Sequence, residues 1–406
     1  MDGITLNVHG TSLGGDCDYL KLRSDSQTFT NLRAYGGSLD LMHTKVTSWN
    51  PSSQSVDMEM SDGRSYISAI SEVVVDGTET CKGVAKTTRG EARLDVMSCE
   101  ISHLGYNASE AWGLSWKVRG LCNDNSNEAS YKNIGVYGDL IDSDIHDLFN
   151  GHYSYGALNG VISGNRVHDN TGYGLDPHNR SQNLTISHNH VFNNDRHGII
   201  FSKWCRGVVV QHNHVHDNAG VGIIAHSLGD HALVAHNTVS NNGGSGIAFL
   251  ESSGSVVYNN TVRNNVHGVR FSVGSSDNVV VRNRLEDNTG YDVYQYRGND
   301  ALVETEKTGN PTANVYLKNS FSGNVGGFRL DDSVDTQFVS NTRIRSWENV
   351  QFQDSKNTLV FGNVFPAGME YIYSGSCLNA ASDISLELVD VCADAPLVSD
   401  RFDSSD

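Results

Sequence analysis

Apolar and polar residues alternate in short runs along most of this chain, and the runs recur at a nearly constant interval. The clearest marker is an Asn followed two positions later by an apolar residue and five positions later by a second Asn. The first Asn of successive copies is Asn165, Asn189, Asn213, Asn237, Asn260, Asn283 and Asn319, with spacings of 24, 24, 24, 23, 23 and 36 residues. Weaker copies begin at Asn341 and Asn363. A fixed period in this range indicates a repeat architecture.

Each repeat contains several short strand-like runs and no pattern with the period of a helix. A Gly begins one alternating run, as in 174–178 and 198–202, and a further apolar run follows, as in 184–186. Such short strands cannot bury an apolar face alone, so successive repeats must stack. We therefore predict an all-β fold, a right-handed parallel β-helix with coils of about 22–24 residues.

The predicted solenoid takes up most of the 406 residues. Residues 1–365 are expected to form the β-helix, with less regular N-terminal coils or a cap at 1–85. Residues 366–406 are expected to form a C-terminal cap and an acidic tail. The interval of 36 residues is one coil plus an insertion from about Arg297 to Ala313, which we expect to leave one turn as a loop. The recurring Asn residues are expected to form a ladder of side-chain amides at a turn.

Stacking the coils on their Gly residues places equivalent residues in columns, with neighbouring strands about 4.8 Å apart. The residue after Gly is apolar in five successive coils, from Leu175 to Val269, and therefore points inward. Alternation then turns Asp176 and His178 outward, and Tyr173, in the position before the Gly, is also expected to face outward. A phenol, a carboxylate and an imidazole on one short strand can perform proton transfer. These three residues form our candidate catalytic centre.

Positive charge is expected beside this centre. The run 112–117 fits the same register and places Trp112 in the column of Tyr173 and Lys117 in the column of His178, although the intervening coil also fits with a shift of one residue. Pro177 favours a functional site over plain scaffold, because Pro removes a hydrogen-bond donor and is excluded from most sheet positions. Further residues expected to bind substrate here are Arg119, Arg196, His197, Lys203, Arg206 and His226.

The charge balance excludes some partners. With 47 acidic residues against 29 Lys and Arg, the net charge is −18, which argues against nucleic acid. An anionic sugar polymer is not excluded, because a groove needs only local positive charge. No apolar run approaches the roughly 18 residues of a membrane span. Residues 1–5 show no secretory signal, so the protein either has none or has had it removed.

The metal-binding residue types show no zinc spacing. Seven Cys occur and none forms a CxxC pair, so we predict no metal site. Two disulfides are candidates, Cys377 with Cys392 and Cys99 with Cys122; the alternative is that all seven are buried thiols. Most of the His residues that flank the first Asn of each repeat are expected to lie on the turn surface; they are His188, His190, His212, His214 and His216.

The strand Tyr-Gly-Leu-Asp-Pro-His at 173–178 resembles the signature of the mannuronan C5-epimerases, the β-helix enzymes that modify alginate. Residues 194–203 are similar to the same family, and the run 110–119 is similar to its brown-algal branch. The resemblance covers roughly residues 90–300. It implies an isomerase that inverts C5 of β-D-mannuronate within the polymer and so produces α-L-guluronate.

The resemblance also implies roles for the candidate residues. One side chain removes the C5 proton and another returns a proton to the opposite face, and His178 and Tyr173 would be that pair. The sequence leaves open which is the base; we favour His178, whose ordinary pKa lies near neutrality. Asp176 would orient His178 or bind the sugar. A cation must neutralise the substrate carboxylate, and the candidates are Lys117, which we place in the catalytic group, Lys203 and Arg206.

The expected partner is an anionic polysaccharide, alginate or polymannuronate, acted on by a monomer secreted to the extracellular matrix or cell wall. No cofactor is needed, and calcium is not indicated, because the chain lacks the Gly-Gly-x-Gly-x-Asp repeats of secreted bacterial members. Two alternatives are an alginate lyase, which expels the C4 substituent instead of reprotonating C5, and a non-catalytic polysaccharide-binding β-helix. A glycoside hydrolase is disfavoured, because it needs a second carboxylate beside Asp176.

Overall fold

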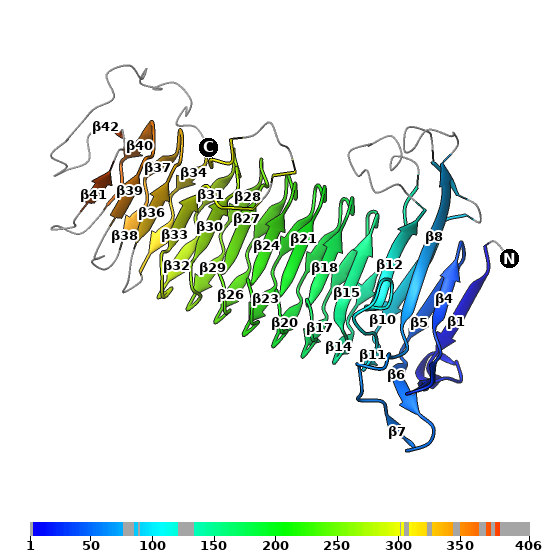
Figure 1. The fold of residues 1–406 in the computed structure, drawn as a ribbon. Helices are drawn as coiled ribbons and strands as arrows, with labels where there is room; N and C mark the ends of the chain where they lie inside the picture. Colours follow the sequence, from blue (N-terminus) through cyan, green and yellow to red (C-terminus); the bar gives the residue numbers. More distant parts are fainter. Residues whose placement is uncertain are drawn as a thin grey trace.

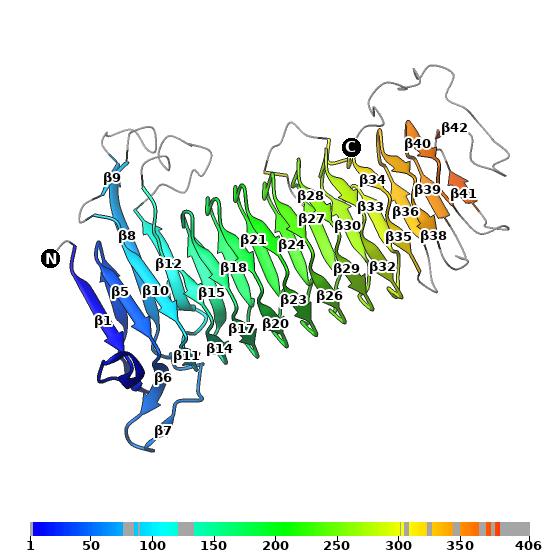
Figure 2. The ribbon, with the colours of Figure 1, turned by 180° about the vertical axis from the view of Figure 1, so that it is seen from behind.

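The computed structural model describes residues 3–75, 85–87, 90–120, 134–300, 302–303, 308–322, 327–343, 350–364, 371–374 and 378–381. Within these ranges the chain winds into three long sheets that run side by side along one axis, from β1 (Thr5–His9) at one end to β41 (Tyr371–Ser374) at the other (Figures 1 and 2). Stacked strands from successive coils pair in parallel, apart from short antiparallel additions near the N-terminus. The predicted fold class, a parallel β-helix, is confirmed.

Sheet 1 contains, in spatial order, β1, β5 (Ser38–Met42), β10 (Arg93–Met97), β13 (Leu140–Ile141), β16 (Val161–Ser163), β19 (Thr185–Ser187), β22 (Val209–Gln211), β25 (Leu233–Ala235), β28 (Val256–Tyr258), β31 (Val279–Val281), β34 (Val315–Leu317), β37 (Gln337–Val339), β40 (Thr358–Phe361) and β42 (Leu378–Ala381). Sheet 2 contains β3 (Thr28–Phe29), β2 (Tyr19–Asp25), β6 (Lys45–Asn50), β11 (Glu100–Ser102), β14 (Asp144–His146), β17 (Arg166–His168), β20 (His190–Phe192), β23 (His214–His216), β26 (Thr238–Ser240), β29 (Thr261–Arg263), β32 (Arg284–Glu286), β35 (Ser320–Phe321) and β38 (Thr342–Arg343), and β7 (Ser55–Val56) pairs with β6. Sheet 3 contains β4 (Leu32–Tyr35), β8 (Ile67–Val75), β12 (Gly113–Arg119), β15 (Asn150–Tyr155), β18 (Leu175–His178), β21 (Ile199–Ser202), β24 (Ile223–His226), β27 (Ile247–Leu250), β30 (Val269–Ser272), β33 (Val293–Tyr296), β36 (Phe328–Asp331), β39 (Val350–Gln353) and β41, and β9 (Ala85–Thr87) pairs with β8. A single 3-10 turn, η1 (Thr11–Leu13), is the helical element of the described residues.

The core consists of columns of apolar side chains that point into the coils. The column predicted to face inward is at most 1% exposed; its members are Leu175, Ile199, Ile223, Ile247 and Val269. In the next inward column of sheet 3, the rings of Phe249 and Phe271 stack with centroids 5.1 Å apart. Branched aliphatic residues fit this environment because parallel strands are covered on their inner face. Each fully buried side chain of this kind contributes roughly 1.5–3 kcal/mol.

Two Asn ladders stabilise the turns on either side of sheet 2. In the first, each side-chain amide donates to Oδ1 of the next Asn at 2.9–3.0 Å, through Asn165, Asn189, Asn213, Asn237, Asn260, Asn283, Asn319, Asn341 and Asn363. The second runs through Asn170, Asn194, Asn218, Asn242, Asn265 and Asn288. Each Oδ1 also accepts a backbone N–H, as Asn213 does from Asn189 at 2.9 Å. The ladder prediction is confirmed.

The predicted insertion after Arg297 lies between β33 and β34, where the chain passes from sheet 3 to sheet 1. The division at residue 365 stays a prediction: β41 and β42 extend sheets 3 and 1 beyond it, and the acidic tail lies outside the described residues. In the part of the chain that the structure describes, no helix is long and apolar enough to cross a bilayer.

Cys99 is a buried free thiol, with Sγ 3.3 Å from the carbonyl oxygen of Leu41. The candidate disulfide between Cys99 and Cys122 was therefore wrong. The other half of that pair lies outside the described residues, as do Cys377 and Cys392.

Candidate active site

The outer face of sheet 3 carries the candidate residues near the middle of the β-helix. Tyr173 immediately precedes Gly174 and β18, and Asp176 and His178 lie within that strand. Upstream, Tyr155 of β15 lies beside His178, and Lys117 of β12 lies beside Tyr155. Lys117 therefore stands in the column of His178 two coils away, as the sequence predicted.

The same register prediction was wrong for Trp112. The pairing of β12 with β15 shifts by one residue before Ser115 reaches Tyr153. This extra residue in β15 moves Trp112 out of the column of Tyr173. Its ring packs instead on Tyr153, with centroids 4.0 Å apart. Tyr153 in turn lies beside Asp176, so an aromatic pair that the sequence analysis missed closes the upstream side of the site.

Pro177 disturbs the sheet where the sequence predicted an irregularity. β18 and β21 pair only at Leu175 and Ile199, whereas β21 and β24 pair at four positions. Because Pro has no N–H to donate, the ladder cannot continue normally through this position. The second half of β18, which carries His178, is thus freed from regular pairing with the following coil.

His178 is poised to accept a proton on one ring nitrogen. Its Nδ1 lies in hydrogen-bond contact with the side-chain oxygen of Asn179. An amide oxygen can only accept, so Nδ1 carries the proton and Nε2 keeps its lone pair. Burial, followed by the positive charge of Lys203, lowers the pKa of His178 to about 4. The imidazole is therefore neutral at pH 7.

The strand alternation places Asp176 on the outer side of β18. The residue is nevertheless buried, with 3% of its surface exposed. Burial raises the pKa of this carboxyl group to about 8, against an opposing effect of Lys203. Its Oδ1 has no hydrogen-bond partner among the described residues. At neutral pH, Asp176 is therefore largely a protonated acid that can donate a hydrogen bond to a ligand.

Tyr173 and His197 form a stacked pair at the other end of β18. Their ring centroids lie 5.4 Å apart, and the guanidinium of Arg196 lies 5.5 Å from the Tyr173 ring and 3.5 Å from its hydroxyl oxygen. The Nδ1 of His197 accepts the backbone N–H of Val221 at 2.8 Å, which leaves Nε2–H as a donor. Burial, then Arg270, lowers the pKa of His197 to about 4, so this ring is also neutral at pH 7.

The basic residues differ in whether a carboxylate already neutralises them. Nζ of Lys117 lies 2.9 Å from Oε1 of Glu110, and Nε of Arg119 lies 3.5 Å from the same oxygen. Lys203 is exposed at the end of β21 and has no ion pair within the described part of the chain. Its charge acts on Asp176, His178 and His226. Lys203 is thus better placed than Lys117 to meet a substrate carboxylate.

His226 lies in the row of candidate residues, whereas Arg206 does not. His226 ends β24 in the column of Ser202, and burial lowers its pKa. Arg206 lies past the turn after β21, where its backbone bridges to Gln182 near sheet 1. Arg270 of β30 was in an outward column but was not singled out from the sequence. Its Nε is buried without a hydrogen-bond partner among the described residues, and its charge acts on His197 and His226.

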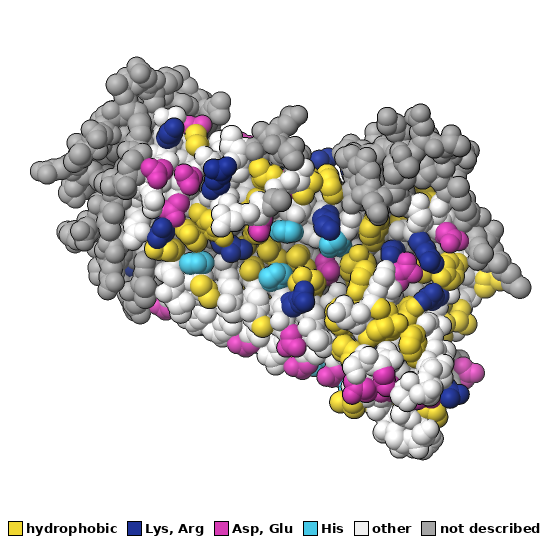
Figure 3. Space-filling view, viewed as in Figure 1, with side chains coloured by type: hydrophobic (Ala, Val, Ile, Leu, Met, Phe, Trp, Pro, Cys, Tyr) yellow, Lys and Arg dark blue, Asp and Glu magenta, His cyan; other side chains and the backbone are white. Residues whose placement is uncertain are grey.

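An apolar strip forms the floor between these polar groups. Ile200, Val221, Ile224 and Ala248 make a cluster on the outside of the coils, against which Tyr173 and Leu250 pack. Figure 3 shows this face, with His and basic side chains gathered around a hydrophobic strip in its middle and acidic side chains along its lower edge. An apolar floor with a few convergent polar groups is typical of a ligand site.

Comparison with known proteins places the chain beside alginate-modifying enzymes. Mannuronan C5-epimerase AlgG of Azotobacter vinelandii is 39% identical over 104 residues, which are 25% of this chain and 19% of that protein. The mannuronan C5-epimerase of Pseudomonas syringae pv. tomato is 34% identical over 118 residues, 29% of this chain and 21% of that enzyme. That of Pseudomonas fluorescens is 30% identical over 171 residues, 41% of this chain and 28% of that enzyme. The chain thus spans only about a fifth to a quarter of the length of these relatives.

Solved structures support the fold. The periplasmic alginate epimerase AlgG superposes with a TM-score of 0.59 and 19% identity, covering 93% of this chain and 77% of that one. A mutant of that enzyme gives a TM-score of 0.68 and 20% identity, covering 83% and 74%. The model of a periplasmic copper-binding protein family, NosD, matches residues 114–242 and 140–304. The predicted similarity to mannuronan C5-epimerases is therefore confirmed, whereas its brown-algal branch stays a prediction.

Proposed function

We propose that this protein is a mannuronan C5-epimerase, which converts β-D-mannuronate to α-L-guluronate within alginate. The observation that carries the proposal is the placement of Asp176 and His178 on β18, with Tyr173 just before it, beside Lys203, a cation with no ion pair among the described residues. The local sequence similarity to mannuronan C5-epimerases supports the same reaction. We assign its place of action outside the cytoplasm, as for the periplasmic enzyme of similar fold.

The reaction begins with the substrate carboxylate. The C5 proton becomes removable only when charge that develops on the adjacent carboxylate is stabilised. Lys203 supplies a cation that no carboxylate of the described residues pairs with, and the protonated carboxyl group of Asp176 supplies a hydrogen-bond donor that adds no negative charge. The apolar floor formed by Ile200 and Ile224 strengthens both interactions, because it excludes water.

His178 then acts as the general base. Its Nδ1 is held by Asn179, so the lone pair of Nε2 takes the C5 proton and the electron pair of the C5–H bond moves into the carboxylate. The imidazole is neutral at pH 7 and therefore able to accept. The product of this step is an enolate-like intermediate and a cationic His178.

Tyr173 returns a proton from the other face. It lies five residues before His178, and a strand rises about 3.3 Å per residue, so the two Cα atoms are at most about 17 Å apart. Arg196, 3.5 Å from the phenol oxygen, stabilises the phenolate that remains. The cycle closes when His178 releases its proton to solvent and Tyr173 takes one up, so no cofactor is consumed.

An alginate lyase shares the first step and differs in the fate of the intermediate. A lyase would expel the C4 oxygen and leave an unsaturated end, whereas an epimerase would give guluronate in an uncut chain. A polysaccharide-binding protein would change neither. We favour the epimerase because Tyr173 supplies a proton donor separate from His178.

The test is incubation of polymannuronate with the purified protein, followed by proton NMR of the product and ultraviolet absorbance of the same sample. We expect guluronate signals that grow with time and no rise in absorbance from unsaturated ends. His178→Asn should abolish the guluronate signals, while His212→Asn, in an exposed turn of the same coils, should retain them. A rise in absorbance would make the protein a lyase, and bound but unchanged polymer would make it a binding module.

A further inference from the structure

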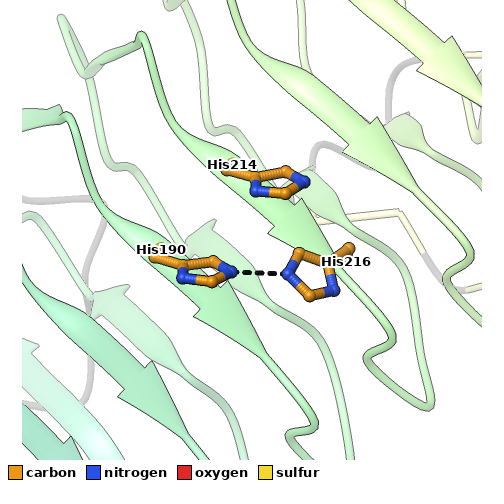
Figure 4. Close-up of side chains that lie close together, drawn as sticks. All are labelled: His190, His214 and His216. Atoms are coloured by element: carbon orange, nitrogen blue, oxygen red, sulfur yellow. Dashed lines mark hydrogen bonds between the residues drawn. The ribbon is translucent and has the colours of Figure 1, made fainter.

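Three histidines converge on the outer face of sheet 2, away from the candidate active site. His190 belongs to β20, and His214 and His216 belong to β23 of the next coil. Each offers a ligand atom, and these atoms all lie within 4.8 Å of one another. Figure 4 shows the three rings together, with the rings of His190 and His214 stacked, their centroids 5.0 Å apart. The sequence predicted that most His residues beside the Asn ladder lie on the turn surface, whereas these three lie within strands.

The hydrogen bonds around the cluster point a lone pair into it. Nδ1 of His216 lies 2.5 Å from the carboxylate of Asp217, which can only accept, so Nδ1 carries the proton. Nε2 of His216 therefore keeps its lone pair, and it lies 2.6 Å from Nε2 of His190. A carboxylate that fixes the tautomer of an imidazole is the usual outer partner of a metal-binding His.

We propose that His190, His214 and His216 bind one late transition-metal dication, Zn²⁺ or Cu²⁺, with Asp217 orienting His216 and water completing the shell. Imidazole nitrogen is a preferred ligand of these ions, whereas Ca²⁺ takes oxygen ligands. Zn–N distances of about 2.0–2.1 Å in a tetrahedral site place the nitrogens about 3.4 Å apart. The separations between the candidate ligand atoms, from 2.6 Å to at most 4.8 Å, span that value, so the rings need to move by about an ångström.

This proposal does not depend on the proposed reaction, and it replaces our expectation of no metal site. The bound ion would link β20 to β23, whose chains continue through short turns into β21 and β24 of sheet 3. A metal clamp here would therefore hold together the two coils that carry His197 and His226. We expect a structural role, seen as a higher melting temperature in the presence of the ion.

The experiment is equilibrium dialysis of chelator-treated full-length protein against Zn²⁺, Cu²⁺ or Ca²⁺, with the bound metal measured by mass spectrometry. We expect one equivalent of Zn²⁺ or Cu²⁺ and no Ca²⁺ at this site. The double variant His214→Thr/His216→Ser should lose that equivalent; it places in β23 the residue types that β26 has at Thr238 and Ser240. Asp217→Asn, which keeps all three imidazoles, should weaken binding by about 10- to 100-fold.

The matched control is His212→Asn, because the same turn position two coils on is occupied by Asn259. This control should bind like the wild type. The proposal is overturned if the wild type takes up neither ion, or if the double variant, shown to be folded by circular dichroism, binds as much as the control. Selective uptake of one ion identifies the metal. Nitrogen hyperfine structure in the electron paramagnetic resonance spectrum of bound Cu²⁺ would confirm imidazole ligation.

Discussion

The side-chain oxygen of Asn179 accepts a hydrogen bond from Nδ1 of His178. This contact fixes the tautomer of the imidazole, so that Nε2 is the nitrogen available for chemistry. Burial and the charge of Lys203 lower the pKa of His178, while the bond to Asn179 acts in the opposite direction. In the proposed reaction, Asn179 is thus a positioning residue, which acts through His178 and does not touch the reacting carbon.

Removing that bond should weaken catalysis in a recognisable way. We expect Asn179→Ala to lower kcat/KM by up to about 10-fold, since a net hydrogen bond contributes about 0.5–1.5 kcal/mol. The acidic limb of the pH profile should move to lower pH, because the bond raises the pKa of His178. Asn179→Asp keeps an acceptor and adds negative charge, so the same limb should move to higher pH. If both variants have the same pH profile as the wild type, Asn179 does not position His178 in the reaction.

Variants of Tyr173 and His178 should lose activity in different ways when the reaction is run in D₂O. With Tyr173→Phe, His178 can still remove the C5 proton and return deuterium to the same face, so mannuronate should gain deuterium while guluronate is strongly reduced. With His178→Asn both exchange and inversion should fall by about 10²- to 10⁴-fold. The measurement is NMR of the polymer after hydrolysis. Normal inversion in Tyr173→Phe would show that another group donates the second proton.

The two lysines in the neighbourhood should not be equivalent. Lys203→Met should lower kcat by about 10²- to 10³-fold, because it removes the cation that faces the developing charge. Lys117→Met should have a much smaller effect, because Glu110 already neutralises this side chain at 2.9 Å. Steady-state kinetics on polymannuronate, with Lys203→Arg as the charge-preserving control, compare them. A larger loss for Lys117→Met would restore it as the catalytic cation.

Asp176 should make the protein less stable as pH rises. Its pKa is about 8 in the folded protein against an ordinary value near 3.8, so the unfolded chain loses this proton first. The stability that the proton provides is complete below about pH 4 and declines by up to about 1.4 kcal/mol per pH unit as the pH rises toward 8. Asp176→Asn removes that dependence. We expect this variant to unfold at a higher temperature than wild type at pH 8, with little difference at pH 4.

The same group should also limit activity at high pH. A neutral His178 requires a pH above about 4, and a protonated Asp176 requires a pH below about 8, so activity should follow a bell between these limits. The variant Asp176→Asn lacks the titrating carboxyl group, so its activity should not show the decline at high pH that this group causes. Its rate should be lower than that of the wild type at every pH. A basic limb that persists unchanged would assign it to another group.

The periodic features were predictable because each coil repeats the same physical solution. The Asn ladders, the inward column headed by Leu175 and the outward position of His178 all follow from a fixed period and strict alternation. Prediction failed where one coil departs from the period. The sequence allowed a shift of one residue in this coil without deciding it, and the extra residue in β15 moves Trp112 out of register.

Side-chain partners were the second limit. Lys117 and Lys203 are both outward cations near β18. What distinguishes them is that Lys117 forms an ion pair with Glu110. Likewise, Asp176 was expected to face solvent, whereas it lies buried beside Tyr153, and this burial changes its protonation. The convergence of His190, His214 and His216 depends on two adjacent coils, so it emerged only once their strands were paired.

The most direct test of the central claim is the reaction of wild-type protein with polymannuronate in D₂O, with the product examined by NMR and by ultraviolet absorbance. The account predicts guluronate that carries deuterium at C5 in a polymer of unchanged length, with no unsaturated ends. Guluronate that retains its original C5 hydrogen, or chains that end in unsaturated sugars, would contradict removal by His178 and return by Tyr173.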